Sequence, residues 1–305
     1  MPQQLTMFGI EANPEIAFEV YHDESGTYVP GAGDRWLLHG VLFVPVVERP
    51  QVFTALQGIR KDTGYFEEVH YLKLRQSTGG PKAQCARGWL NLYVAQLSEF
   101  CYYHCLAVDT HSPTFEHNRF PKPHYAYNRF ARMAIEGAIA WNLKRYHRVA
   151  LIFYSDSKFR QEGDNFATYV PSQVMKSIQE KRQQKPSAYP DLRLLHPEVI
   201  AVDSDPAKVA PDLREESELI QLVDLMTSNI TQAVTGRSGQ KAKIALAEVA
   251  ARWIEDTRKP PWLQTEELHR RFSVSFFPNE QKRFYNPELA VTKRNQLPLF
   301  ENEEK

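Results

Sequence analysis

The sequence predicts an α/β fold in which helices cover the faces of one mixed sheet. Two strand-like segments come first, with no helix between them, and later strand-like segments alternate with long amphipathic segments. A hairpin followed by strand–helix alternation gives antiparallel and parallel strands in the same sheet. Hydrophobic residues make up 42% of the 305 positions, which is enough for a packed core.

The first two predicted strands form an antiparallel pair. Residues 17–22 alternate between apolar and polar side chains, and 36–44 is an apolar run bounded by Gly and Pro. Residues 149–154 are almost continuously apolar, as expected of a strand that is buried on both faces. Two further strands are predicted at 102–108 and 199–202.

Segments in which apolar residues recur at helical spacing lie between and after these strands, and the pattern is clearest after residue 126. Helices are predicted at 52–59, 82–100, 126–144, 165–185, 215–234 and 241–256. We expect one domain over residues 15–277, with an extension at 1–14 and a loosely attached tail at 278–305.

Composition excludes several classes of protein. No apolar run approaches the roughly 18 residues of a membrane span, and the first residues lack the pattern of a signal peptide. The three cysteines, Cys85, Cys101 and Cys105, suit a reducing cytoplasm better than a disulfide scaffold. A formal net charge of zero excludes a globally basic coat protein but permits a local basic groove. We therefore expect a cytoplasmic protein without a membrane partner.

Acidic residues follow three of the predicted strands. Asp23, Asp156 and Asp203 each stand at a strand end, where an open sheet presents groups to ligands. Asp224 lies in an apolar helical segment with Gln221 on the same face. A buried Asp must be paired, hydrogen-bonded or bound to a metal.

Each of these aspartates also has a structural explanation. Asp23 could form an Asx-type turn with the Ser and Gly that follow it. Asp156 and Asp203 could be helix N-caps, and Asp224 could pair with an Arg or a hydroxyl. Alternatively, three or four carboxylates from different elements could hold two Mg²⁺ or Mn²⁺ ions about 4 Å apart for attack on a phosphodiester.

Three stretches carry a resemblance to a known family. They are Tyr-His-Asp-Glu-Ser-Gly at 21–26, Glu-Val-His at 68–70, and Val-Asp-Ser at 202–204 followed by Leu-Ile-Gln-Leu-Val-Asp-Leu at 219–225. In these the chain resembles the bacterial domain of unknown function 3800, whose members are similar to RNase H-like proteins. The resemblance spans most of residues 17–234.

The resemblance implies an RNase H-like mixed sheet flanked by helices and a metal-dependent nuclease site that uses Mg²⁺ or Mn²⁺. Carried over position by position, the predicted catalytic carboxylates and metal ligands are Asp23, Glu68, Asp156 and Asp224. Glu24 is a further predicted ligand. His70 is predicted to be a general acid/base or a phosphate contact. The implied substrate is nucleic acid, with DNA favoured over RNA.

Other polar clusters have weaker interpretations. A basic helix end is either a solvated face or a set of phosphate contacts near Asp156; it comprises Lys176, Lys181, Arg182 and Lys185. Three histidines on one loop suggest a solvated or nucleic-acid-contacting loop, or a second metal site: His111, His117 and His124. The segment from Cys101 to Cys105 lacks further ligands at zinc spacing, so we expect buried structural cysteines.

The two ends of the chain carry the same short pattern. Residues 4–8, Gln-Leu-Thr-Met-Phe, and 296–300, Gln-Leu-Pro-Leu-Phe, both fit Gln-Leu-x-(Leu/Met)-Phe. This resembles the pentapeptide by which bacterial polymerases and repair proteins bind the β sliding clamp. The predicted clamp contacts are Gln4, Leu5, Met7, Phe8, Gln296, Leu297, Leu299 and Phe300. Alternatively, these apolar ends pack on the protein's own surface.

The sequence thus favours a divalent-metal-dependent nuclease that the sliding clamp recruits to DNA. Two alternatives stay open. One is a non-catalytic adaptor associated with the clamp or DNA, in which the carboxylates are structural. The other is a phosphohydrolase that acts on small nucleotides.

Overall fold

The computed structural model describes residues 14–157, 162–256 and 272–278, and within them one sheet of seven strands. The strand order is β5-β4-β1-β2-β3-β7, and β6 pairs with β4 beyond the end of β5. The strands are β1 (Ile16–Ser25), β2 (Trp36–Pro45), β3 (Tyr102–Asp109), β4 (Arg148–Asp156), β5 (Asp191–Leu194), β6 (Ile200–Val202) and β7 (Phe272–Phe277).

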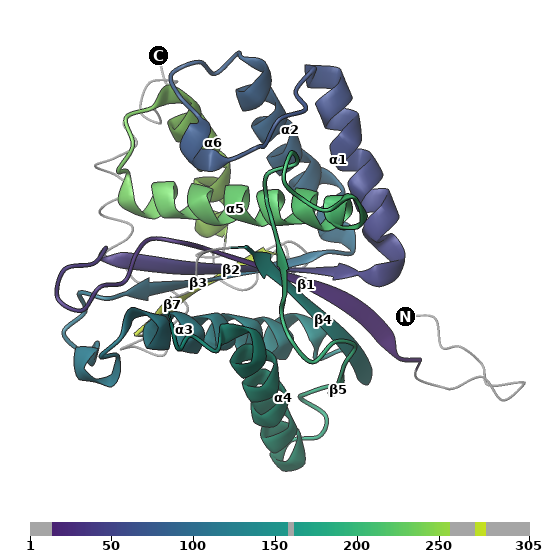
Figure 1. The fold of residues 1–305 in the computed structure, drawn as a ribbon, viewed down its shortest axis with the longest axis vertical. Helices are drawn as coiled ribbons and strands as arrows, with labels where there is room; N and C mark the ends of the chain where they lie inside the picture. The colour runs from purple at the N-terminus through teal and green to yellow at the C-terminus, as the bar shows by residue number, and fades with distance from the viewer. Residues whose placement is uncertain (1–13, 158–161, 257–271, 279–305) are drawn as a thin grey trace, which may run out of the picture.

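Helices cover both faces of this sheet (Figure 1). They are α1 (Arg49–Thr63), α2 (Pro81–Ala95), α3 (Pro123–Ala138), α4 (Phe166–Gln184), α5 (Arg214–Thr235) and α6 (Lys241–Asp256). α5 lies along the sheet with α1, α2 and α6 above it, whereas α3 and α4 lie on the opposite face. Each face carries its own apolar cluster, so burial of the two sheet faces accounts for the three-layer arrangement.

β1 lies at the centre of the sheet. It pairs with β2 in antiparallel register and with β4 in parallel register, while β2 and β3 continue the antiparallel part. β5 and β6 are parallel to β4, and β7 is parallel to β3. The predicted α/β class is therefore confirmed: the sheet is mixed, helices flank it, and the arrangement is consistent with an RNase H-like fold.

Two strands and several boundaries differ from the prediction. β5 and β7 were not predicted: β5 has only four residues, and the alternating Phe-Ser-Val-Ser-Phe pattern of β7 was overlooked. The helix predicted at 82–100 ends at Ala95, and a 3-10 turn at Leu97–Glu99 leads into β3. α1 is longer than predicted and ends at Gly64, whose positive φ of 66° is a conformation that glycine adopts without strain.

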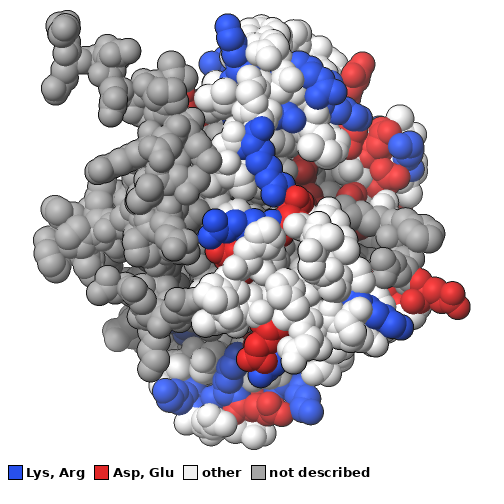
Figure 2. Space-filling view, turned by 90° about the vertical axis from the view of Figure 1, so that its left-hand side faces the viewer, with Lys and Arg blue, Asp and Glu red and all other residues white. Residues whose placement is uncertain are grey.

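The described surface shown in Figure 2 mixes the two signs of charge. Lys and Arg side chains alternate there with Asp and Glu side chains, in line with the formal net charge of zero. Within the residues that the structure describes, no helix combines the length and the apolar character that crossing a membrane requires.

Candidate functional site

Asp23 and Asp156 lie at the same edge of the sheet because their strands are parallel neighbours. Tyr21 pairs with Tyr154 and His22 with Ser155, so the next residue of each strand is an aspartate. Asp23 is inside β1, opposite Gly40 of β2, so the Asx-turn explanation is wrong. The ladder rather than a turn fixes the backbone of Asp23.

α5 brings Asp224 to this edge through a close approach to β2. A Cβ atom on Gly40 would overlap the Thr227 hydroxyl and lie 2.6 Å from the Tyr103 hydroxyl, which themselves are 2.9 Å apart. Glycine therefore lets the helix pack against the strand residue that faces Asp23. Thr227 is three residues after Asp224, on the same side of α5.

The loop after α1 is held in place by Arg60, which is almost fully buried. Its guanidinium donates to the Glu67 carbonyl at 2.7 Å and to the Glu218 carboxylate at 2.8 Å. It also donates to Gln221 Oε1 at 3.0 Å, and this same oxygen accepts the Val69 N–H at 2.8 Å. These hydrogen bonds fix residues 65–70 against α5, and they place Glu68 and His70 at the sheet edge.

The six residues predicted as catalytic or metal-binding line one cavity of about 300 Å³. They are Asp23, Glu24, Glu68, His70, Asp156 and Asp224. We call this space the carboxylate cavity; Gln221, Ser204 and Ser228 also line it. Its acids come from β1, the loop after α1, β4 and α5, which are far apart in the sequence.

His70 and Asp224 form the best-defined contact in the carboxylate cavity. His70 Nδ1 is 2.7 Å from Asp224 Oδ2, which also accepts the Tyr71 N–H at 3.1 Å. Ser228 donates to the other oxygen, Oδ1, at 3.1 Å. The hydrogen bond that His70 donates to Asp224 raises the pKa of His70, burial opposes this increase, and the charges of Asp224, Glu68 and Asp23 add to it.

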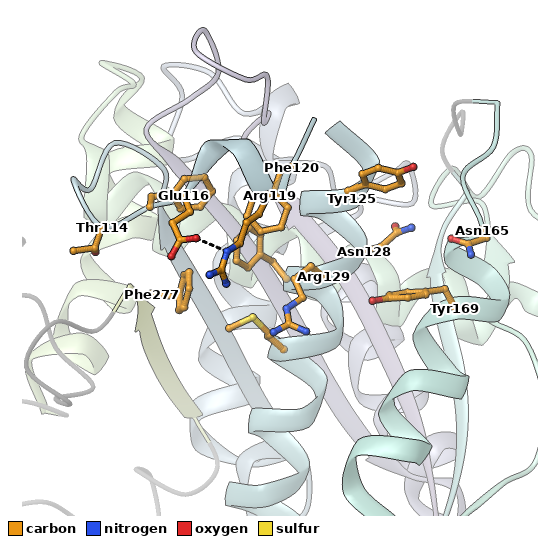
Figure 3. Close-up of a pocket in the computed structure, with 13 residues that line it drawn as sticks. Thr114, Glu116, Arg119, Phe120, Tyr125, Asn128, Arg129, Asn165, Tyr169 and Phe277 are labelled. Atoms are coloured by element: carbon orange, nitrogen blue, oxygen red, sulfur yellow. Dashed lines mark ion pairs between the residues drawn. The ribbon is translucent and has the colours of Figure 1, made fainter. Parts of the chain in front are cut away.

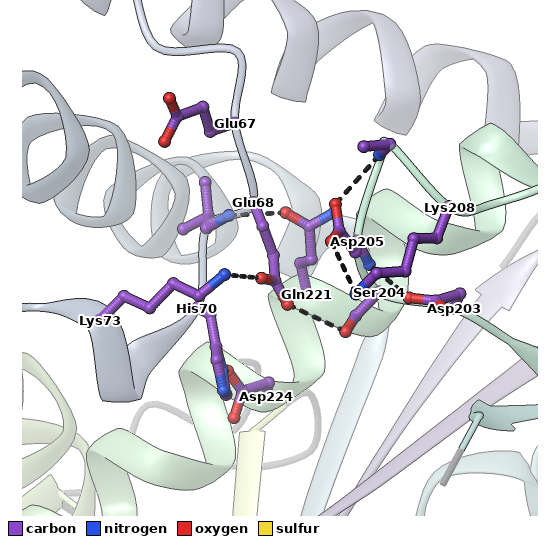
Figure 4. A network of polar contacts seen from close by, with 12 residues as sticks. Glu67, Glu68, His70, Lys73, Asp203, Ser204, Asp205, Lys208, Gln221 and Asp224 are labelled. Carbon is purple, nitrogen blue, oxygen red and sulfur yellow. Dashed lines mark hydrogen bonds and ion pairs between the residues drawn. The ribbon is translucent and has the colours of Figure 1, made fainter.

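Glu68 points across the cavity towards the turn after β6 (Figure 4). Its Oε1 accepts a hydrogen bond from the Ser204 hydroxyl at 3.1 Å, and its Oε2 forms an ion pair with Lys73. Asp203 accepts the Asp205 N–H at 2.9 Å, so it makes an Asx turn rather than a helix N-cap. This turn presents Ser204 to the cavity.

Glu24 links the carboxylate cavity to the opposite face of the sheet. The Tyr127 hydroxyl of α3 donates to its Oε2. Below it, His22 and His39 are buried with Nε2 and Nδ1 3.1 Å apart, and His22 Nδ1 is 3.3 Å from the Ser155 hydroxyl. His22 and Glu24 thus share the face of β1 that packs under α3, whereas Asp23 is on the other face.

The acids of the carboxylate cavity are of the chemical type that binds a hard divalent cation, because carboxylate oxygens are the ligands that Mg²⁺ and Mn²⁺ prefer. In the described part of the chain, however, no three His, Cys, Asp or Glu side chains stand in an arrangement that could hold a metal ion. The Lys73 ammonium contacts Glu68, and His70 contacts Asp224. A cation would therefore compete with Lys73 for the oxygens of Glu68 and with His70 for the oxygens of Asp224.

Two sets of residues proposed from the sequence lie elsewhere. Asp156 ends β4, whereas the basic residues begin ten residues into α4, about 15 Å or more along the helix from its first residue. There Lys181 pairs with Glu136 at 2.8 Å, so of the two interpretations of this basic end the structure favours a solvated face over phosphate contacts beside Asp156. His117 stacks on Tyr28, and His124 is buried at the start of α3.

Four residues that contact a cavity acid were not predicted to do so: Lys73, Ser204, Ser228 and Tyr127. Two of them had a usable signal, because Ser204 belongs to the Val-Asp-Ser motif and Ser228 is four residues after Asp224 on one helical face. The three cysteines are buried and free, as expected of structural cysteines. The terminal pentapeptides at 4–8 and 296–300 lie outside the described residues.

A search of protein-family models finds no match to this chain, and a search of curated proteins finds none either. The resemblance to domain of unknown function 3800 therefore rests on the motifs quoted above, and the function must be argued from the site.

Proposed function

We propose that this protein is a divalent-metal-dependent nuclease that cleaves phosphodiester bonds in the carboxylate cavity. The observation that carries the proposal is the convergence of Asp23, Glu68, Asp156 and Asp224, from four separate elements, on one cavity at the edge of an RNase H-like sheet. Carboxylate oxygens are the ligands that hard divalent cations prefer, and four of these side chains reach one small space.

Asp23, Glu68, Asp156 and Asp224 are the residues that would hold Mg²⁺ or Mn²⁺. Such an ion, when bound, lowers the pKa of water and stabilises the oxygens of a phosphodiester under attack. Carboxylates that share one site repel one another, and a bound cation would relieve that repulsion.

His70 has a separate role in this proposal. Its raised pKa keeps a larger fraction of the imidazole protonated near neutral pH than an isolated histidine would have. A protonated imidazole beside the cavity can give its proton to the leaving oxygen of the cleaved bond. Asp224 would hold the ring through Nδ1, so that the ring keeps one orientation during the transfer.

A cleavage assay tests this function. Labelled single- and double-stranded DNA and RNA would be incubated with the full chain in Mg²⁺, in Mn²⁺ and in a chelator. We expect cleavage that requires the metal, and Asp23→Asn and Asp224→Asn should each reduce the rate by about a hundredfold or more. Asp62→Asn removes an exposed carboxylate of α1 outside the cavity and should leave the rate unchanged.

Metal binding can be measured without activity. Mn²⁺ should raise the Tm of the wild type, because a ligand that binds the folded state stabilises it, and should raise the Tm of Asp23→Asn less. Cleavage that persists in Asp224→Asn, or that ignores the chelator, would contradict the proposal. Hydrolysis of free nucleotides alone would instead support the small-nucleotide phosphohydrolase.

We also propose that the β sliding clamp recruits the protein through its terminal pentapeptides. In such a peptide Leu and Phe enter an apolar pocket, while Gln fixes the orientation by hydrogen bonds. Recruitment would supply affinity for DNA that a chain of zero net charge does not gain from its surface. Purified clamp should be captured by the wild type and lost with Phe8→Ala/Phe300→Ala, while cleavage of free oligonucleotides stays the same.

Equal capture of the clamp by both proteins would rule out recruitment through the pentapeptides. Capture without any metal-dependent cleavage would favour the non-catalytic adaptor.

A further inference from the structure

A second cavity, of about 570 Å³, lies on the face of the sheet that α3 and α4 cover. Figure 3 shows that its walls combine aromatic side chains with two arginines. The residues that matter here are Phe120, Tyr125, Tyr169, Phe277, Arg119 and Arg129, and we call this space the aromatic–arginine cavity. Phe120, Tyr169 and Phe277 also pack against the apolar cluster under α3, whereas Tyr125 and the two arginines are not part of that cluster.

The arginines leave positive charge in this cavity. Glu136 is the acid that acts on Arg129, but it already pairs with Arg132 at 3.1 Å and with Lys181 at 2.8 Å. Burial, followed by the charge of Arg132, lowers the pKa of Arg129. Arg119 pairs with Glu116, yet both side chains are more than half exposed, so this ion pair contributes little and can exchange for another anion.

Aromatic rings lie next to these charges. The Tyr125 side chain is 46% exposed, which is unusual for a ring of this size, and Tyr169 lies beside the mouth of the cavity at the first turn of α4. Every nucleobase has a π face that can stack on such rings, and this stacking tolerates any base sequence. Arginine provides bidentate hydrogen bonds to phosphate. The chemistry therefore matches a base together with a phosphate.

The first two turns of α3 connect this cavity to the carboxylate cavity. Tyr125 and Arg129 line the aromatic–arginine cavity, while Tyr127 between them donates to Glu24 of the carboxylate cavity. Asn128 donates to Asp164 at 2.9 Å, which fixes the start of α4 against α3. Tyr127 and Glu24 therefore link the two cavities.

We propose that the aromatic–arginine cavity binds single-stranded nucleic acid a few nucleotides away from the bond that is cleaved. Bases stack on Tyr125 and Tyr169, and a phosphate forms ion pairs with Arg129 and Arg119. This inference rests on the proposed nuclease function, and it names the form of the substrate and the residues that hold its flanking strand.

Binding can be measured separately from cleavage. Fluorescence anisotropy would be recorded with labelled oligothymidylate and oligouridylate of about 12 nucleotides, in a chelator, on the full chain. Tyr125→Ala should raise the Kd about tenfold by removing one stacking surface. Arg129→Glu should raise it at least as much and flatten the salt dependence of the Kd, because one phosphate contact is lost. The two oligonucleotides separate DNA from RNA.

The matched control is Arg87→Glu, which reverses an exposed charge on α2, on the other face of the sheet. It changes the net charge as Arg129→Glu does and should leave the Kd within about twofold. Circular dichroism checks that every variant is folded.

Equal affinity in the wild type and Arg129→Glu would overturn the inference, as would a Kd that Arg87→Glu weakens just as much. Binding of a peptide covering residues 293–302 in the cavity, without oligonucleotide binding, would also overturn it. Oligonucleotide binding that needs Tyr125 and Arg129, without cleavage in any metal, supports this site while the nuclease proposal fails. Metal-dependent cleavage together with an unchanged Kd in Tyr125→Ala and Arg129→Glu would support the nuclease proposal and overturn this binding site.

Discussion

His70 and His104 show how two regions of one molecule set opposite behaviour in the same side chain. His70 lies in the carboxylate cavity, where its hydrogen bond to the Asp224 carboxylate raises its pKa. His104 lies within the sheet between β3 and β7, with Nδ1 at 2.7 Å from the Ser273 hydroxyl and Nε2 at 3.1 Å from the Ser275 hydroxyl. Burial lowers the pKa of His104 to about 4.

The difference comes from the partners of each ring. Both ring nitrogens of His104 form hydrogen bonds with uncharged serine hydroxyls of β7. The ring therefore links β3 to β7 and stays neutral. The carboxylate next to His70 favours the charged ring, which can therefore gain and lose a proton near neutral pH. A histidine in this protein thus serves packing or chemistry according to whether its neighbours carry charge.

The largest effect that separates the two regions is expected from Arg60→Leu. Glu218 would stay buried without its cation, which typically costs about 3–5 kcal/mol. Loss of the bonds to Glu67 and Gln221 would release the loop that carries His70, so the pKa of His70 should fall while His104 stays unaffected. Urea unfolding and histidine NMR titrations measure the two consequences.

Lys61→Leu is the matched control for this change, because Lys61 is the next residue of α1 and is exposed. It should alter the free energy of unfolding by less than about 0.5 kcal/mol. If Arg60→Leu unfolded at the same urea concentration as the wild type, Arg60 would not hold the loop.

Much of the site was predictable because its acids follow recognisable strands or interrupt an apolar helix. Asp23 and Asp156 stand at neighbouring strand ends, and Asp224 breaks the apolar segment of α5. These are local signals, and the parallel pairing of two central strands was enough to bring the first two together.

The contacts that complete the site were not predictable in this way. Arg60 reaches α5 across a sequence separation of 158, a long-range contact that depends on how the layers pack and that periodicity does not report. Lys73 is only five residues after Glu68, but their ion pair depends on the 3-10 turn that contains Lys73. β7 is a different case, because its Phe-Ser-Val-Ser-Phe segment alternates as a strand does and was overlooked.

The second-largest effect concerns the pH dependence of stability. The unfolded chain protonates His104 near pH 6.5, whereas the folded chain resists this until about pH 4. Stability from the neutral ring is therefore complete above pH 6.5 and is lost as the pH falls to about 4, by about 3 kcal/mol. His70 acts in the opposite sense: its contribution is present below pH 6.5 and is lost as the pH rises through its folded pKa.

His104→Gln isolates the first contribution, because an amide can still bond to the serines but does not titrate. Glu19, Glu216 and Glu218, whose pKa values are raised by burial, stabilise the protein towards acid pH in both proteins and cancel in the difference. The wild type should lose stability relative to His104→Gln between pH 6.5 and pH 4 in urea unfolding. Parallel stability curves would show that His104 is not the cause.

A smaller effect is expected from Gly40→Ala, which tests the packing that brings Asp224 to His70. The added Cβ would collide with Thr227 and Tyr103 and push α5 away from β2, at a cost of about 1–3 kcal/mol. Gly58→Ala is the opposite case, because a Cβ in that helical position meets nothing within 4 Å. It should stabilise α1 by about 0.5–1 kcal/mol. Thermal unfolding would report equal effects of both changes if close packing at Gly40 were unimportant.

The smallest effect, and the most direct test of the comparison, is the pKa of His70 in Asp224→Asn. The amide can still accept a hydrogen bond, but it carries no charge, so the protonated ring loses its main stabilisation and the pKa should fall. Glu68→Gln should lower this pKa less, because Glu68 acts on His70 through its charge alone. The titration of His104 should be the same in all three proteins. An unchanged pKa of His70 in Asp224→Asn would mean that another group holds its proton, and the proton donor proposed for cleavage would then have to be sought elsewhere in the cavity.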